Sequence, residues 1–428
     1  ELADKETIVQ YFAPKLEMTR DPVVGYKKIL SELNFDFEDH LNGSYYARRV
    51  YGDKTEEEYN QKRSNLVNKF KNDSLSSVNY LIKEFEMRKS AQLYKRAQVS
   101  KIGSLDMRKV YAYKLKDDLF KRVTTLPQGK NHGMIMLVDW SGSMDGVLED
   151  TLKQVINLAM FCQRIQVPYR VYAFTSQYED RQAEETMEQT MERHARYREW
   201  RAKREGLDGV LSNANGFNLL EFFSNKMTTS EFNSMAKRIL DHRFRWNKGY
   251  STGGTPLNEA LAWCYLNIGK FIKNNNIEKT TFITLTDGEG GQFTTLDGGR
   301  RGLDPERSEV VDGQYKRIKM KHFIKDEVTQ KTYEITRDST VQSDVLLRMI
   351  KDRYNVSMIG FHICRNHKRD LDSVIRANIP NYNGNSYMLI ENWRKEFRAN
   401  NFASIKNTGR DELFIIPQSS TKIVEGDL

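Results

Sequence analysis

The sequence lacks the features that mark several common protein classes. Its 428 residues include only 3 cysteines, none of them in a CxxC pair, and 7 scattered histidines with no HExxH motif. A disulfide scaffold, a zinc ribbon and a histidine-based metal site are therefore not expected. Glycine (26) and proline (8) are too sparse for a collagen-like or low-complexity chain.

Long apolar runs are also missing. No stretch reaches the roughly 18 apolar residues that a membrane-spanning helix needs. The opening segment, ELADKETIVQ, is too charged for a signal peptide. Together with the unpaired cysteines, these absences predict a cytoplasmic protein that has no membrane partner. The net charge of +9 permits binding to nucleic acid or another anionic partner without requiring it.

Residues 1–128 have the pattern of a helical N-terminal domain. Apolar residues recur at helical spacing in segments 26–37, 59–70 and 78–85. Residues 53–55 and 73–74 have the composition of helix caps. We therefore expect several separate helices in this part of the chain.

Residues 129–428 alternate between short apolar runs and amphipathic segments. The expected strands are 134–138, 169–174, 281–285, 356–363 and 412–416. The expected helices are 148–161, 257–272, 341–354 and 393–402. Such alternation predicts a doubly wound α/β domain with a mostly parallel sheet.

Two insertions interrupt this alternation. Residues 177–248 are long, charged and helix-prone. Residues 292–339 begin with a loop rich in glycine, aspartate and arginine. Within this second insertion, segments 315–320 and 331–336 have a pattern that fits a hairpin.

The strongest chemical signal follows the first expected strand. The segment Asp139-Trp140-Ser141-Gly142-Ser143 brings one carboxylate and two hydroxyls to the strand end, where open α/β sheets bind ligands. These donors are all oxygens, and Mg²⁺ or another hard cation such as Mn²⁺ or Ca²⁺ prefers oxygen ligands. Asp139 could instead only cap a helix while Ser141 bonds to the backbone.

Two later loops add donors at the same sheet edge. Thr255 follows two glycines that would allow close approach of the backbone, and Pro256 after it suits a helix start. Asp287 comes directly after the strand at 281–285 and adds a second carboxylate. We therefore predict one metal site formed by Asp139, Ser141, Ser143, Thr255 and Asp287.

These five residues resemble the metal-ion-dependent adhesion site (MIDAS) of the von Willebrand factor A (VWA) domain. That family combines an aspartate-x-serine-x-serine strand end with a distal threonine and a distal aspartate, and all five positions are matched here. The resemblance implies a VWA/Rossmann-like fold and a metal site that accepts an acidic residue from a partner.

From about residue 100 onward, the chain resembles more closely the cobaltochelatase T subunit, a branch of VWA proteins with phage-encoded relatives. The resemblance is carried by Gly103–Asp106, Phe120–Arg122, the His132-Gly133 lead into the first strand, and the segment GGTPLNEAL at 253–261. It implies a MoxR-type AAA+ ATPase partner, a large chelatase subunit as a further partner, and a role in metal insertion into tetrapyrroles for cobalamin biosynthesis. The acidic low-complexity stretch of that family is not seen here.

The sequence offers little for catalysis within the chain itself. It has no GxxxxGK[ST] phosphate-binding loop, and Ser141 lacks the GxSxG context of a nucleophilic serine. We therefore expect no catalytic residue and a non-catalytic adaptor. The alternative is a nucleic-acid-associated or virion-assembly protein on a VWA scaffold. Two basic clusters bear on this alternative. The first, Arg193–Arg204, includes Tyr197 and Trp200 and could bind single-stranded nucleic acid, whereas the interspersed Glu192, Glu199 and Glu205 indicate a salt-bridged helix instead. The second, Lys316–Lys321, could equally be the exposed face of a strand.

Overall fold

A computed structural model describes most of the chain. The described residues are 7–17, 21–32, 56–96, 98–105, 120–125, 131–176, 187, 191, 195, 210–212, 217–241, 250, 252–287, 290–291, 294–297, 300–301, 303–311, 314–364, 387–400, 402–406 and 409–417. The basic cluster at 193–204 lies outside this set, apart from Ala195.

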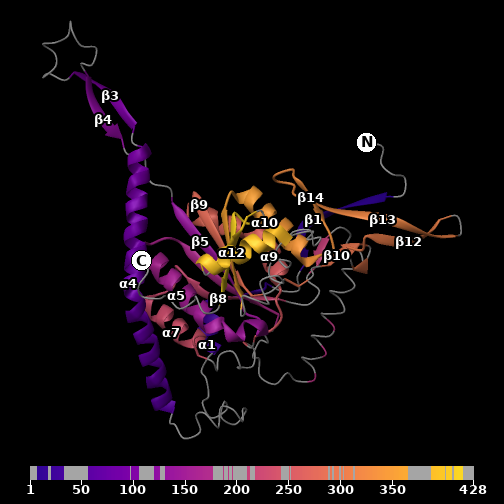
Figure 1. Cartoon of the computed structure of the whole chain (residues 1–428), viewed down its shortest axis with the longest axis horizontal. Helices are drawn as coiled ribbons and strands as arrows, with labels where there is room; N and C mark the ends of the chain where they lie inside the picture. The colour runs from indigo at the N-terminus through magenta and orange to yellow at the C-terminus, as the bar shows by residue number, and fades with distance from the viewer. Residues whose placement is uncertain are drawn as a thin grey trace.

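An eight-stranded sheet forms the centre of the molecule (Figure 1), with the strand order β16-β17-β15-β9-β5-β6-β8-β2. Its strands are β2 (Val23–Val24), β5 (His132–Asp139), β6 (Tyr169–Thr175), β8 (Asn218–Ser224), β9 (Lys279–Thr286), β15 (Ser357–Cys364), β16 (Ala403–Ile405) and β17 (Glu412–Pro417). Strands β6, β5, β9, β15 and β17 run parallel to one another. Strand β8 is antiparallel to β6, and β16 is antiparallel to β17. The expected α/β class with a mostly parallel sheet is confirmed.

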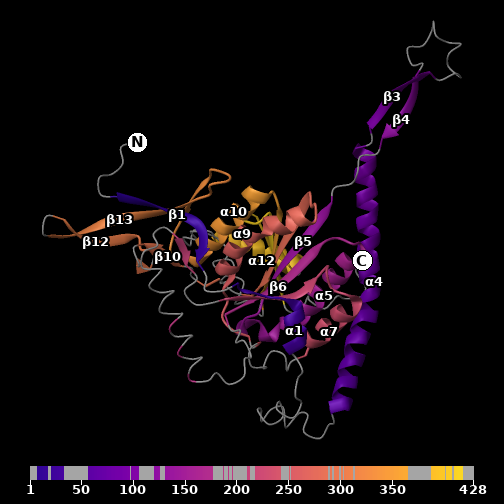
Figure 2. The same cartoon turned by 180° about the vertical axis from the view of Figure 1, so that it is seen from behind.

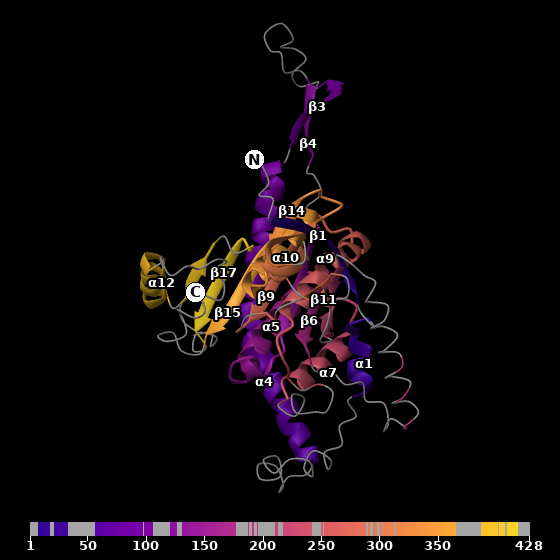
Figure 3. The same cartoon turned by 90° about the vertical axis from the view of Figure 1, so that its right-hand side faces the viewer.

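Helices cover both faces of this sheet. These helices are α1 (Tyr26–Glu32), α5 (Leu148–Arg164), α7 (Thr229–Ile239), α9 (Leu257–Asn274) and α10 (Ser339–Tyr354). Helix α12 (Tyr387–Asn400) contacts the edge strand β16 instead. Met136 and Val138 of β5 pack in one core with α1, α5 and α7, whereas Ile135 and Leu137 pack in the other core with α9 and α10. Because alternate residues of β5 point to opposite faces and helices cover both faces, both sets are buried, and residues 134–138 are all apolar. Figure 3 shows α12 beside β17, at the opposite edge from α1.

A second sheet lies beside the first. It consists of β1 (Thr7–Glu17), β7 (Val210–Ser212), β10 (Thr294–Asp297), β11 (Arg300–Arg301), β12 (Glu306–Val311), β13 (Gln314–Lys325) and β14 (Thr332–Ile335). The expected hairpin is only partly right. Residues 332–335 pair with 322–325, whereas the early part of β13 pairs with β12 instead. The turn at 326–331 therefore joins a longer first strand than the sequence indicated.

A single long helix replaces two of the expected helices. Helix α4 runs without a break from Glu56 to Arg96, so the predicted cap at 73–74 is wrong. Ser74 is instead buried, and Val67 and Val78 are buried on the same side of the helix. The ring of Phe85 meets Phe161 of α5 at 5.7 Å between centroids. Packing against α5 thus overrides the local capping signal. Strands β3 (Gln98–Leu105) and β4 (Phe120–Thr125) form a hairpin beyond the end of α4 (Figures 1 and 2).

The expectation of an all-helical segment at 1–128 is wrong for the described residues. Strand β1 pairs with β13, and β2 joins β8 at the edge of the central sheet. Both partners lie hundreds of positions later in the sequence, so local periodicity could not reveal the pairing. The purely helical reading of 177–248 is also wrong, because β8 in that segment is buried along most of its length and belongs to the central sheet.

In the described part of the chain, we find no helix that combines the length and the apolar character required to cross a membrane.

Candidate metal centre

The predicted site residues gather at the carboxyl ends of two neighbouring parallel strands. Asp139 is the last residue of β5, and Asp287 directly follows β9, which pairs with β5. After Asp139 the chain turns into a short 3₁₀ helix, Gly142–Gly146. This turn carries Ser141 and Ser143 back over the strand end. The strand register and the turn together account for the convergence of residues that are far apart in sequence.

Hydrogen bonds connect three of the predicted residues. The hydroxyls of Ser141 and Ser143 lie 2.8 Å apart, and the Ser143 hydroxyl donates to Oδ1 of Asp287 at 2.7 Å. Ser141 is buried, whereas Ser143 is exposed and Asp287 is partly buried. The cluster therefore has a buried side at Asp139 and Ser141 and an open side at Ser143.

Asp139 has the most unusual environment of the set. Its side chain is fully buried, and its Oδ2 accepts a hydrogen bond of 2.6 Å from the Thr286 hydroxyl. Within the described structure, its buried Oδ1 accepts no hydrogen bond of ordinary geometry, although the Ser141 hydroxyl and N–H lie close enough to the carboxylate to favour its ionised form. Burial raises the pKa of this carboxyl to about 7, with the charge of Asp287 adding to the increase and the Thr286 and Ser141 hydroxyls opposing it. A buried carboxylate oxygen without a partner is costly, and a bound cation would satisfy it.

Backbone contacts hold the Thr255 loop against the same strand end. Gly253 forms a parallel bridge with Ser141: the Gly142 N–H donates to the Gly253 carbonyl at 2.9 Å, and the Gly253 N–H donates to Trp140 at 3.2 Å. Thr255 follows two residues later and is partly buried. Among the described contacts, none joins its hydroxyl to the other four predicted ligands. The structure thus brings Asp139, Ser141, Ser143 and Asp287 together and places Thr255 on the adjacent loop.

Three further residues support the site, and sequence reasoning did not identify them. Thr286 orients Asp139, the Ser176 hydroxyl accepts a 2.7 Å hydrogen bond from the Gly254 N–H, and the buried Trp140 indole donates to the Tyr250 carbonyl at 2.9 Å. Thr286 precedes Asp287, and Ser176 follows β6, so both lie at strand ends. Their position at strand ends could have marked them as candidates from the sequence. Their contacts, however, depend on how the neighbouring strands are aligned, and the sequence alone does not give that alignment.

The donor set suits a hard cation. It contains two carboxylates and hydroxyls, all of them oxygen ligands of the kind that Mg²⁺, Mn²⁺ and Ca²⁺ accept. The described residues include no group of three or more His, Cys, Asp and Glu side chains placed to hold a metal. The predicted site differs from such a group, because three of its five residues are serine or threonine and would contribute hydroxyl oxygens. The orphaned Asp139 oxygen is the observation that best fits a cation here.

Two of the cysteines are buried free thiols, as expected. Cys162 and Cys264 both lie in the core. Burial raises the pKa of Cys162 to about 12 and raises that of Cys264 as well, so neither thiol forms the reactive thiolate near neutral pH. The Cys364 side chain lies outside the described residues.

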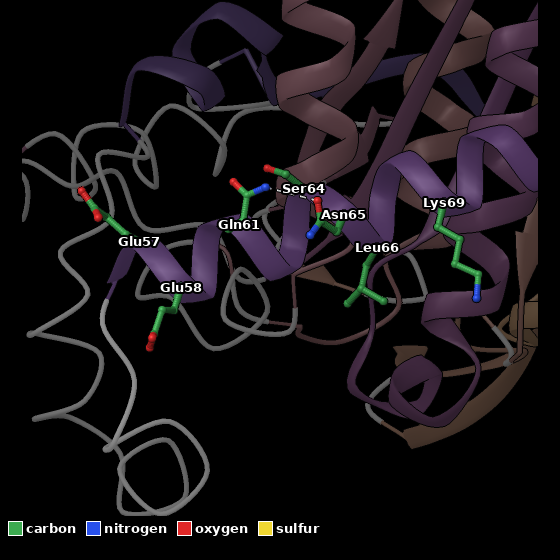
Figure 4. Close-up of a pocket in the computed structure, with 7 residues that line it drawn as sticks. All are labelled: Glu57, Glu58, Gln61, Ser64, Asn65, Leu66 and Lys69. Atoms are coloured by element: carbon green, nitrogen blue, oxygen red, sulfur yellow. Dashed lines mark hydrogen bonds between the residues drawn. The ribbon is translucent and has the colours of Figure 1, made fainter.

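A surface depression lies elsewhere, along the first turns of α4 (Figure 4). It is lined by side chains of that one helix, including Glu57, Gln61 and Lys69. Gln61 donates to Asn65 at 3.3 Å across it. The lining residues carry no arrangement of acid, base or metal ligands that would make it an active site.

Comparisons with known proteins do not identify a family. No protein-family model matches the chain, and no curated protein matches it. Among solved structures, the chain is similar to the pilus adhesin SpaC from Lactobacillus rhamnosus GG in its open conformation. That alignment has a TM-score of 0.29 and 15% identity over 55% of this chain and 24% of the adhesin. A second similarity is to the three N-terminal domains of the type V pili tip protein Mfa5 from Porphyromonas gingivalis, with a TM-score of 0.22 and 9% identity over 43% of this chain and 22% of that one. The chain thus spans less than a quarter of either structure, and these similarities carry no functional argument.

Proposed function

We propose that this protein is a VWA-type adaptor that binds a partner through a divalent cation. Asp139, Ser141, Ser143, Thr255 and Asp287 would hold Mg²⁺, with Mn²⁺ or Ca²⁺ as alternatives. The observation that carries the proposal is the buried, unpartnered Oδ1 of Asp139 beside a chain of hydrogen bonds from Ser141 to Asp287. The mostly parallel sheet, with helices on both faces and the cluster at its carboxyl edge, supports a VWA-like fold.

Each residue has a definable part in such a site. Asp139 supplies the buried negative charge, and Thr286 fixes its orientation through Oδ2, leaving Oδ1 for the cation. Ser143 and Asp287 lie on the accessible side, so they border the path by which a partner would approach. When bound, the cation would retain positive charge and accept a carboxylate from outside the chain.

The partner that this chemistry fits is a protein that presents an exposed Asp or Glu. The resemblance to the cobaltochelatase T subunit favours a MoxR-type AAA+ ATPase within a chelatase-like or remodelling assembly, with a large chelatase subunit as a further partner. The chain would then couple the ATPase to its target and would carry out no chemical step of its own. Removing the cation should weaken assembly.

A binding experiment tests this proposal. The full chain would be immobilised and its binding to a MoxR-type ATPase measured in Mg²⁺ and in EDTA, for the wild type and for Ser143→Ala. Ser143 is exposed, so this variant should fold normally. Asp304→Asn, an exposed change outside the site, is the control. Binding that is lost in EDTA and in Ser143→Ala but kept in Asp304→Asn supports the proposal, and binding indifferent to EDTA contradicts it.

A further inference from the structure

The second sheet presents one outward face that the metal-site proposal does not use. Along β13, side chains alternate between two environments. Met320, His322 and Ile324 are buried, whereas Arg317, Lys319, Lys321 and Lys325 are exposed. Because alternate residues of a strand lie on opposite faces, these four cations share the outer face with Phe323 between them. We call this surface the β13 outer face.

The cations form a regular row. Same-face neighbours on a strand are spaced by about 6.7 Å, an interval similar to the separation of phosphates along an extended nucleotide strand. Two acidic residues, Glu306 opposite Lys319 and Glu334 opposite Phe323, lie on the same face. Four cations against two acids leave an excess of two positive charges (4 − 2). The Arg317–Glu306 pair is 4.0 Å apart and well exposed, so it neutralises Arg317 only weakly.

Aromatic rings lie within this row. Tyr11 of β1 stands opposite Phe323 in the parallel register, with the two ring centroids 5.8 Å apart and the planes inclined by 30°. Tyr11 is 61% exposed, and Tyr315 near the distal end of β13 is 84% exposed. Large rings left in water forgo the stabilisation of burial, and a planar partner that stacks on them would recover it.

The inner face keeps this platform in place. Phe12 and Ile324 are buried in the core shared with α9 and α10, and Phe12 stacks on His322 at 5.7 Å. The proximal part of β1 and β13 is therefore anchored, while β12 and the distal part of β13 extend away from the body (Figures 1 and 2). Changes on the outer face should leave this inner packing intact.

We infer that the β13 outer face binds single-stranded nucleic acid. Lys319, Lys321 and Lys325 would pair with phosphates, and Tyr11 with Phe323 would offer a surface on which bases stack. An acidic protein segment could pair its carboxylates with the lysines, but it would not provide planar groups to stack on the exposed rings. An anionic membrane would need more apolar surface than this face provides. The combination of a cation row with exposed rings on a flat sheet is what favours a nucleotide strand.

The inference is tested by fluorescence anisotropy with labelled oligo(dT) and oligo(U) and the full chain. Pairing of the three lysines with phosphates predicts that log K falls with log salt at a slope of about −2, since each neutralised phosphate on a single strand contributes about −0.7. Lys319→Gln with Lys321→Gln should reduce the magnitude of this slope by about 1.4. Tyr11→Ala should weaken binding about fivefold or more, since one stacked base contributes roughly 1–3 kcal/mol, and should leave the slope unchanged.

A matched control separates this face from general charge attraction. Lys69→Gln with Lys83→Gln removes the same charge from exposed positions on α4 (Figure 1) and should leave binding unchanged. A preference for oligo(dT) or oligo(U) identifies DNA or RNA as the ligand, and either supports the inference. No binding, an equal loss in the α4 control, or no effect of Tyr11→Ala overturns it. Tighter binding to vesicles of anionic phospholipid also overturns it and would assign the face to a membrane surface.

Discussion

The Thr286 hydroxyl donates a 2.6 Å hydrogen bond to Oδ2 of Asp139, from the end of one parallel strand to the end of its neighbour. This contact fixes one oxygen of a fully buried carboxylate and leaves the other, Oδ1, without a hydrogen bond in the described structure. A side chain held in this way is already placed to receive a cation.

Removing the Thr286 hydroxyl should weaken metal binding without removing a ligand. In Thr286→Val, Asp139 loses the hydrogen bond that favours its ionised form, so we expect about tenfold weaker Mg²⁺ affinity, since a hydrogen bond to a charged group contributes about 1.5–3 kcal/mol. Thr286→Ser retains a hydroxyl and should restore most of the affinity. Isothermal titration calorimetry measures both variants. Equal affinity in Thr286→Val and in the wild type would show that this contact does not orient a ligand.

Asp139→Asn should increase the stability of the metal-free protein while removing its ability to bind the cation. Burial raises the pKa of Asp139 to about 7, so above that pH the metal-free protein holds a buried charge at a cost of about 4 kcal/mol. An amide removes the charge, although its N–H would lack a partner at a cost of about 1–3 kcal/mol. We expect the metal-free variant to be more stable than the wild type by about 1–3 kcal/mol at about pH 8.

Chemical denaturation in EDTA and in Mg²⁺ checks this prediction. Mg²⁺ should raise the free energy of unfolding of the wild type and leave Asp139→Asn unchanged. A variant that is still stabilised by Mg²⁺ would contradict the assignment of Asp139 as a ligand.

The buried side chain of His362 predicts that the free energy of unfolding depends on pH under acidic conditions. His362 of β15 is fully buried, and burial together with the positive charge of Arg410 lowers its pKa to about 4. In the unfolded chain the pKa of a histidine is about 6.5. Above pH 6.5, His362 is neutral in both states and its full contribution to the free energy of unfolding is present. As the pH falls from 6.5 toward 4, the unfolded chain takes up a proton that the folded protein does not, so this contribution is lost. The loss amounts to about 3 kcal/mol.

The comparison of wild type with His362→Leu isolates this contribution. Asp139 and Glu259, whose buried carboxyls each have a pKa of about 7, act in the opposite direction over the same range in both proteins. The difference in unfolding free energy between the two proteins should therefore change by about 3 kcal/mol between pH 6.5 and pH 4. A constant difference across this range would show that His362 does not titrate as described.

Helix α7 provides a test that the segment 177–248 is part of the folded body. The Thr228 hydroxyl accepts from the Glu231 N–H, and the Glu231 carboxylate accepts from the Thr228 N–H at 2.8 Å. Thr228→Ala removes one half of this capping box and should cost about 1 kcal/mol of unfolding free energy. Thr228→Ser should retain it. If Thr228→Ala leaves the unfolding free energy unchanged, α7 does not unfold together with the core.

The sequence predicted best those strands whose apolar character is continuous. Strands β5 and β9 are buried on both faces, so a run such as Met134–Val138 identifies them without knowledge of their partners. Strand β1 was missed because its apolar residues Ile8, Val9 and Tyr11 are exposed and its partner β13 lies about three hundred positions away. The long α4 was divided at Asp73-Ser74 because capping signals are local, whereas packing against α5 is not.

The candidate site was predicted in part for the same reason. Four of its residues, Asp139, Ser141, Ser143 and Asp287, follow strands that were correctly placed, and the structure brings them together. The hydroxyl of Thr286 was overlooked because its role depends on the β5–β9 register. Metal binding itself stays a prediction.

Direct titration with Mn²⁺, followed by electron paramagnetic resonance, tests the central claim most directly. The full wild-type chain should bind one Mn²⁺ that Mg²⁺ displaces, and Asp139→Asn should abolish binding while Asp304→Asn preserves it. A wild-type chain that leaves all the Mn²⁺ free in solution, or an Asp139→Asn variant that binds it as the wild type does, would contradict the account.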